Sequence, residues 1–150
     1  MIRWEAHTCL PLHPDASFDP LERYRTAGVH YVSINVGMDM NPLSQILPVI
    51  AAFRARLLAR PDHYTIPRTV ADIERARHEG KLAVAFDLEG ALPLLERPEM
   101  VAFYRDLGVR QMHFAYNRNN SVAGGCHDRP QGLTPLGRRM VDAVNDAGML

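Results

Sequence analysis

Strand-like and helix-like segments alternate along the whole sequence. The strand-like segments are rich in apolar, β-forming residues and cover 2–8, 29–37, 82–90 and 109–116. Alternation of this kind is typical of βα units, in which a helix connects two parallel strands. We therefore expect an α/β fold built on a parallel sheet.

The helix-like segments carry the residues that commonly begin and end helices. Ile46, Ile50, Phe53 and Leu57 recur at helical spacing between the second and third strand-like segments, which predicts an amphipathic helix there. Three further helices have both a predicted N-cap and a glycine just past the end. The N-caps are Asp19, Thr69 and Thr134, and the glycines are Gly28, Gly80 and Gly148.

The segment 82–90 distinguishes two kinds of parallel sheet. Because side chains alternate across a strand, one face carries only large apolar residues and the other carries small residues followed by carboxylates. The first face is Leu82, Val84, Phe86 and Leu88, and the second is Ala83, Ala85, Asp87 and Glu89. This pattern favours a (β/α)₈ TIM barrel, in which strand ends point into the site. An open doubly wound sheet stays as the alternative, although no glycine-rich phosphate loop follows any strand.

The length of the chain allows only part of such a barrel. The 150 residues contain about four βα units, and the chain reads Met149-Leu150 where a fifth strand would begin. Half a barrel would leave two open strand edges. We therefore expect residues 1–150 to form the N-terminal half of one barrel domain, completed either by further residues of a longer protein or by another chain.

Composition excludes several functional classes. Apolar residues make up 47% of the chain, and 17 basic residues balance 17 acidic ones, so the basic surface that nucleic-acid binding requires is not expected. Two cysteines do not make a disulfide framework, and no apolar run is long enough to span a membrane. With no targeting signal in view, these features predict a cytoplasmic protein that binds a small molecule.

His7 and Cys9 are the first candidate ligands for a metal. They lie two residues apart and so share one face of the first strand, with Arg3 and Glu5 further back on that face. Imidazole and thiolate both bind zinc well. The alternative is that His7 is a hydrogen-bonded core histidine and Cys9 a small buried residue.

Polar residues at other strand ends extend this candidate site. Glu89 ends the third strand-like segment and would face the same barrel mouth as His7 and Cys9, whereas Asp87 is expected to be a buried hydrogen-bonding residue. Tyr116 ends the fourth segment, and Asn119 on the following loop could orient a substrate. The adjacent Cys126, His127 and Asp128 are interpreted as a surface loop, because neighbouring residues seldom converge on one ion.

Longer stretches of the sequence resemble the membrane (renal-type) dipeptidases, the M19 peptidases of the amidohydrolase superfamily. They are WEAHTCLPL, DIERARHEGKLAVAFDLEGALPL, LGVRQMHFAYNRNNSVA and QGLTPLGRRMVDAVNDAGML. The resemblance covers essentially the whole chain. It implies a (β/α)₈ barrel that holds one or two Zn²⁺ ions at its C-terminal mouth, acts on dipeptides or related amides and, by analogy with other members, forms a homodimer.

The resemblance also implies roles for individual residues. His7 matches a zinc ligand on the first strand, and Glu89 matches the catalytic glutamate that bridges the two metals. Cys9 stands where the family has an aspartate ligand, and Tyr116 stands where it has a substrate-binding histidine. Ala91 replaces a glycine that usually follows the glutamate. The two remaining ligands of the family, both histidines, and its later catalytic aspartate would lie after Leu150.

Three functions are consistent with these residues. The first is a zinc-dependent dipeptidase, in which a metal-activated water attacks the peptide carbonyl. The second is a non-peptidase amidohydrolase on the same scaffold, with a changed substrate or metal content. The third is a catalytically impaired homologue that serves in binding or assembly.

Overall fold

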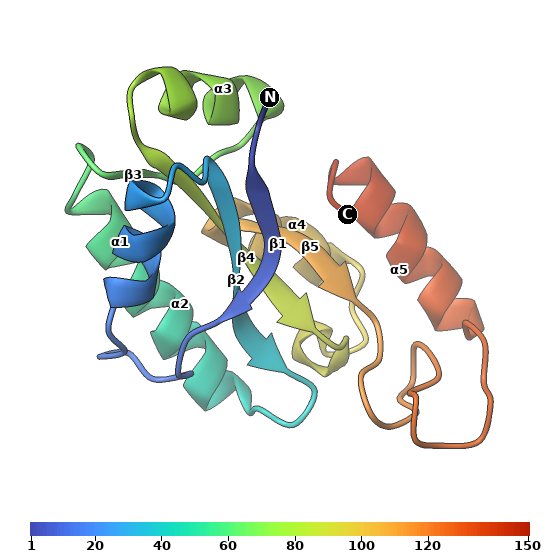
Figure 1. Cartoon of the computed structure of the whole chain (residues 1–150). Coiled ribbons are helices and arrows are strands. Elements are labelled where there is room, and N and C mark those ends of the chain that lie inside the picture. The colour runs from blue at the N-terminus through green and yellow to red at the C-terminus, as the bar shows by residue number, and fades with distance from the viewer.

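A parallel sheet forms the centre of the molecule in the computed structural model, which describes all residues from Met1 to Leu150 (Figure 1). Strands β1, β2 and β4 lie side by side in that order, and β4 also pairs with both β3 and β5. Every pair is parallel. The strands are β1 (Trp4–Cys9), β2 (Tyr31–Met38), β3 (Tyr64–Thr65), β4 (Leu82–Glu89) and β5 (Val109–His113). The predicted α/β class is confirmed.

Helices connect the strands and cover one side of the sheet. In Figure 1, α1 and α2 lie together beside β1 and β2, α5 lies beyond β5, and α3 lies at the end of the sheet where the N-terminus is found. The helices are α1 (Asp19–Thr26), α2 (Leu43–Leu58), α3 (Val70–His78), α4 (Glu99–Leu107) and α5 (Pro135–Asp146), and Leu92–Leu94 forms the 3₁₀ helix η1. No helix is both long and apolar enough to cross a membrane.

The two faces of β4 differ as its sequence predicts. Its large apolar residues are fully buried in one core together with apolar residues of β2 and α2. On the other face, Ala83 and Ala85 lie in a smaller cluster with Tyr31 and Ala76. Further along that second face, toward the C-terminal strand ends, the buried side chains become polar: Ser33, Asn35 and Asp87.

The predicted caps are correct for two helices and wrong for one. Thr69 caps α3 through a reciprocal capping box with Asp72, and the Thr134 hydroxyl accepts a hydrogen bond from the Gly137 amide at the start of α5. Asp19 is already the first residue of α1, and Phe18 holds the cap position without a side-chain bond. The Asp19 amide instead donates to the Ser17 hydroxyl at 3.1 Å.

The last residue, Leu150, lies alongside β5. The Leu150 amide donates to the Arg110 carbonyl, and the Leu150 carbonyl accepts from the Met112 amide. These two bonds follow the pattern of a parallel strand pair. The segment after α5 therefore takes the place in the sheet that the sequence predicts for a further strand.

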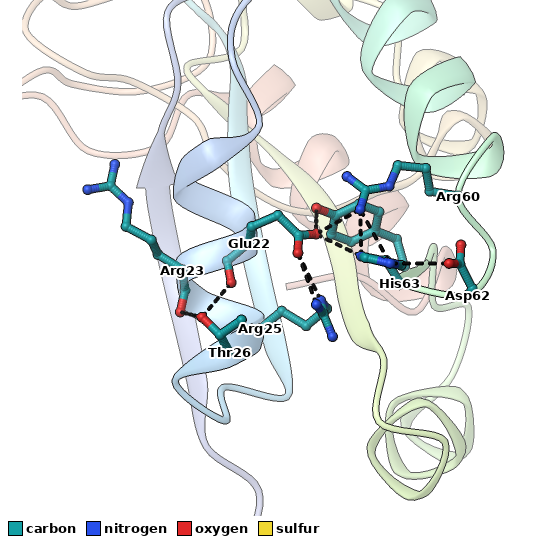
Figure 2. Close-up of polar contacts among 8 residues, drawn as sticks. Glu22, Arg23, Arg25, Thr26, Arg60, Asp62 and His63 are labelled. Atoms are coloured by element: carbon teal, nitrogen blue, oxygen red, sulfur yellow. Dashed lines mark hydrogen bonds and ion pairs between the residues drawn. The ribbon is translucent and has the colours of Figure 1, made fainter.

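A cluster of charged and aromatic side chains joins α1 to the segment between α2 and β3 (Figure 2). The Glu22 carboxylate accepts hydrogen bonds from Tyr64 and Arg25 and lies 3.0 Å from the Nδ1 atom of His63. Burial opposes ionisation, but the hydrogen bonds from Tyr64, Arg25 and His63 outweigh it and lower the pKa of Glu22 to about 2. This carboxylate thus stays charged and fixes α1 against β3.

Candidate metal and substrate site

His7 reaches across the inner face of the sheet to two carboxylates on β4. Its Nδ1 atom lies 3.0 Å from Oδ1 of Asp87, and its Nε2 atom lies 3.3 Å from Oε1 of Glu89. Strand β2 lies between β1 and β4, and its inward side chains there are the short Ser33 and Asn35. Short residues on the middle strand therefore allow the imidazole to meet residues two strands away.

Asp87 is buried and orients the imidazole. The Ser33 hydroxyl donates to its Oδ2 atom at 2.6 Å, and the Asn35 amide donates to its Oδ1 atom at 3.4 Å. Burial raises the pKa of Asp87, while the bonds from Ser33, His7 and Asn35 work in the opposite direction. A His7 Nδ1–H that donates to Asp87 leaves the Nε2 lone pair directed toward Glu89. The predicted role of Asp87 as a buried hydrogen-bonding residue is confirmed.

Cys9 lies beside the same imidazole. Its Sγ atom is 3.6 Å from Nε2 of His7, and no disulfide is formed. Burial, and then the negative charges of Glu89 and Asp87, raise the pKa of the Cys9 thiol. A cation held between these groups would act in the opposite direction and favour the thiolate.

The three predicted ligands fit part of a metal donor set. Two atoms that bind one zinc ion tetrahedrally lie roughly 3.3–3.8 Å apart, and the His7–Glu89 and Cys9–His7 separations of 3.3 and 3.6 Å agree with that range. However, no group of three or more His, Cys, Asp or Glu side chains in this chain is arranged to hold an ion. His7, Cys9 and Glu89 therefore supply only part of the set of ligands that a zinc ion needs.

A cavity of about 400 Å³ opens beside these residues. Gln111 and His113 of β5 line it together with His7, Asp87 and Glu89. His113 is paired in register with Glu89, and the Gln111 amide donates to the Ala6 carbonyl of β1. Neither residue is predicted from the sequence, because the β4–β5 register shifts between Phe86 and Asp87 and the alternation of residues does not reveal this bulge.

Tyr116 and Asn119 lie beyond the end of β5. The strand stops at His113 instead of continuing to residue 116 as predicted, and the Tyr116 ring stacks on the His113 ring with centroids 5.7 Å apart. The Asn119 side chain donates to the Arg129 carbonyl and accepts from the Gly125 amide. Tyr116 thus lies next to the cavity, whereas Asn119 braces its own loop, and substrate binding by either residue stays a prediction.

The loop that contains Cys126 and His127 forms no metal cluster. Both residues are exposed, in agreement with the predicted surface loop. Asp128 accepts hydrogen bonds from the Arg118 guanidinium at 2.8 Å and from the Asn119 amide at 2.7 Å. These contacts give Asp128 a structural role within the loop.

Asp39 connects the segments that follow three strands. Its backbone amide donates to the Glu89 carbonyl, and its carboxylate accepts from the Leu92 amide and from the Asn120 side chain. A β-carbon on Gly90 would lie 2.1 Å from Cγ of Asp39, and Gly90 has a φ of +123°. Only glycine suits this position, because any other residue would be strained and would displace Asp39.

The parallel strands, with a histidine, carboxylates and a cavity at their C-terminal ends, define the class of barrel-type α/β proteins. Within that class, residues 23–150 match the sequence model of the membrane dipeptidase family, peptidase family M19. The chain belongs to this family. A search of curated protein sequences finds no match.

Solved structures show the same fold. An amidohydrolase from Pseudomonas aeruginosa superposes with a TM-score of 0.85 and 22% identity, over 99% of this chain and 44% of that one. The probable dipeptidase PvdM from the same organism superposes with a TM-score of 0.82 and 21% identity, over 100% of this chain and 46% of that one. A metallopeptidase from Rhodobacter sphaeroides, liganded with a phosphinate mimic of the dipeptide L-Ala-D-Ala, superposes with a TM-score of 0.68 and 20% identity. The match covers 87% of this chain and 47% of that one.

The chain thus spans less than half the length of these three structures. A partial TIM barrel, as predicted, accounts for the parallel sheet and for this coverage. The similarity to these three structures establishes the fold of the chain.

Proposed function

We propose that this chain supplies the first ligands of a zinc-dependent dipeptidase, a hydrolase that cleaves the peptide bond of small substrates with a free amine and a free carboxylate. The observation that carries the proposal is the placement of the His7 Nε2 atom between Glu89 and Cys9 while Asp87 holds the other ring nitrogen. Membership of the dipeptidase family supports the reaction class.

His7, Cys9 and Glu89 would each contribute a ligand, as a partial donor set, to one or two metal ions. A divalent ion there would supply Lewis acidity toward a peptide carbonyl and lower the pKa of a water molecule. Asp87 keeps the proton of His7 on Nδ1 and so keeps Nε2 free as a ligand, an arrangement common among metal-binding histidines. Glu89, whose side chain is only 13% exposed, places a second negative charge at the same point.

The cavity residues are suited to binding a polar substrate. Tyr116 is a neutral hydrogen-bond donor beside the His113 ring, and it stands where the family resemblance implies a histidine. A phenol can donate to a carbonyl or a developing oxyanion. We infer that Tyr116 contacts the substrate and that Asn119 acts by shaping the loop beneath it.

Cys9 is the residue that separates this proposal from its alternatives. A thiolate forms a softer and longer bond to zinc than a carboxylate does, about 2.3 Å against 2.0–2.2 Å. The change at this position favours a metal site tuned differently from that of other members. A non-peptidase amidohydrolase is the second candidate for this reason.

The test is the metal content of the purified full-length protein. We expect stoichiometric zinc in the wild type, less zinc in Cys9→Ala, and unchanged zinc in Cys126→Ala, which removes the other free thiol. In cobalt(II)-substituted protein, the thiolate charge-transfer absorption should disappear only in Cys9→Ala. A wild type without stoichiometric metal, or equal losses in both variants, would rule out the proposed ligands.

The substrate class requires a separate assay. A panel of L-L dipeptides, L-D dipeptides and cyclic amides should show turnover of at least one dipeptide by the zinc-loaded protein. Turnover of cyclic amides alone would favour the non-peptidase alternative. A metal-loaded protein that hydrolyses none of them would favour a role in binding or assembly.

A further inference from the structure

A second cavity, of about 640 Å³, lies at the opposite end of the sheet from His7 and Glu89. It is lined by residues near the N-terminal end of β4, by β3, and by Gly148 after α5. None of these residues belongs to the candidate metal and substrate site. The cavity is therefore separated from the candidate metal site by the length of β4.

The lining of this cavity is strongly basic. The lining contains five cationic side chains and a single carboxylate, that of Asp106, although the whole chain has no net formal charge. Two of the five have acidic partners: Lys81 lies 2.7 Å from Glu79, and Arg105 lies 3.0 Å from Asp106. The other three, Arg54, Arg68 and Arg110, form no ion pair within the chain.

The three arginines without acidic partners are held in different ways. Arg110 is half-buried, and its guanidinium donates to the carbonyls of Pro67, Arg105 and Val109 through Nε and NH1, which leaves its NH2 group free. Arg54 donates to the Leu107 carbonyl. The Arg68 side chain is exposed and makes no hydrogen bond in the chain. Two hydrogen-bonded guanidinium groups, of Arg54 and Arg110, and the unbonded one of Arg68 thus border the same space.

The electrostatic state of Arg110 supports an excess of positive charge here. Burial lowers the pKa of Arg110, and the charges of Arg68 and Arg105 act in the same direction, against the smaller opposing effects of Tyr31 and Asp106. Asp106 pairs with Arg105, but Arg54, Arg68 and Arg110 have no acidic partner, and like charges kept close together destabilise the folded chain. An anion bound in the cavity would relieve this repulsion.

We propose that this cavity binds a small phosphate-bearing ligand. Guanidinium groups match the geometry of phosphate oxygens and form charge-assisted hydrogen bonds with them. Three unmatched positive charges suit a dianion better than a single carboxylate. Free phosphate and an organic phosphate monoester share this chemistry, and the test separates them.

The test is calorimetric titration of the full-length protein with inorganic phosphate, pyrophosphate and phenyl phosphate, at constant ionic strength. We expect saturable binding that Arg68→Gln weakens roughly tenfold, the loss typical of one charged hydrogen bond. Arg68→Glu should abolish it. Preference for inorganic phosphate over phenyl phosphate would identify free phosphate as the ligand, and the reverse would identify a monoester.

Arg77→Gln is the matched control, because Arg77 is an exposed arginine of α3 that does not line the cavity. It should bind each phosphate compound as the wild type does. Arg68 is exposed and makes no hydrogen bond through its side chain, and its charge repels Arg110, so its replacement should not lower the melting temperature. Absence of saturable binding to the wild type at 10 mM ligand, or equal weakening in Arg68→Gln and Arg77→Gln, would overturn the proposal.

Discussion

The Nδ1 atom of His7 lies 3.0 Å from Oδ1 of Asp87, although the two residues are on strands that do not pair with each other. Because Nδ1 is occupied by this contact, Nε2 is the ring nitrogen of His7 that could bind a metal ion. The same carboxylate is held in place by Ser33 and Asn35 of the intervening strand. We therefore expect Asp87 to act as a positioning residue through His7.

If His7 binds zinc as we propose, replacing Asp87 by Asn should weaken zinc binding without removing a ligand. The amide cannot stabilise the Nδ1–H tautomer as a carboxylate does, and losses of roughly 10- to 100-fold in metal affinity are typical of such changes. Zinc affinity can be measured by competition with a chromophoric chelator. Ser33→Ala removes a bond to the Asp87 carboxylate but leaves His7 in place, so it should cost about 1.5–3 kcal/mol of stability, as for other hydrogen bonds to charged groups, and little zinc affinity. Equal affinity in Asp87→Asn and wild type would contradict this role.

Gly90→Ala should destabilise the fold much more than Gly80→Ala. Both glycines have positive φ angles, +123° and +69°, but only at Gly90 would a β-carbon collide with another residue, the Asp39 carboxylate. We expect a loss of about 1 kcal/mol for Gly80→Ala from backbone strain alone and at least about 2 kcal/mol more for Gly90→Ala. Urea denaturation measures both values. Similar losses in the two variants would mean that Asp39 moves aside freely.

The Glu22 cluster should make the stability of the protein depend on pH in the acidic range. The folded-state pKa of Glu22, about 2, lies below its ordinary value of 4.5. Its contribution is therefore fully present above pH 4.5 and is lost as the pH falls from 4.5 toward 2. Urea denaturation between pH 3 and pH 6 should show a shallower loss of stability in Glu22→Gln than in the wild type. Glu74→Gln, which changes an exposed side chain of α3 without an ion pair, should retain the wild-type slope.

The parallel α/β fold could be predicted because its main signals are local. Alternation along β4 identified its two faces, and Thr69 and Thr134 identified two helix starts. Helix α4 was missed because its N-cap, Pro98, makes no side-chain capping bond. The two-residue strand β3 is too short to have a recognisable period.

The candidate site was predicted in part, and the missing parts depend on strand register. His7 and Glu89 could be placed at one mouth because each lies at or near the C-terminal end of its strand, but the β1–β2 register shifts between Glu5 and Thr8. Glu5 consequently pairs with Val32 and shares the core-side face of Thr8, contrary to its predicted place beside His7. The shift in β5 similarly brings Gln111 and His113 into the cavity. Bulges depend on contacts between strands and leave no periodic trace in one strand.

The bonds of Asp39 limit how the mouth of this barrel can be redesigned or can diverge. The segments that follow β2, β4 and β5 meet at this one carboxylate. Asp39 follows β2, Leu92 and Gly90 follow β4, and Asn120 follows β5. A loop transplanted from another protein at any one of these positions would leave the other two without their anchor. These three loops therefore have to be exchanged as a set, with Asp39, Gly90 and Asn120 carried along.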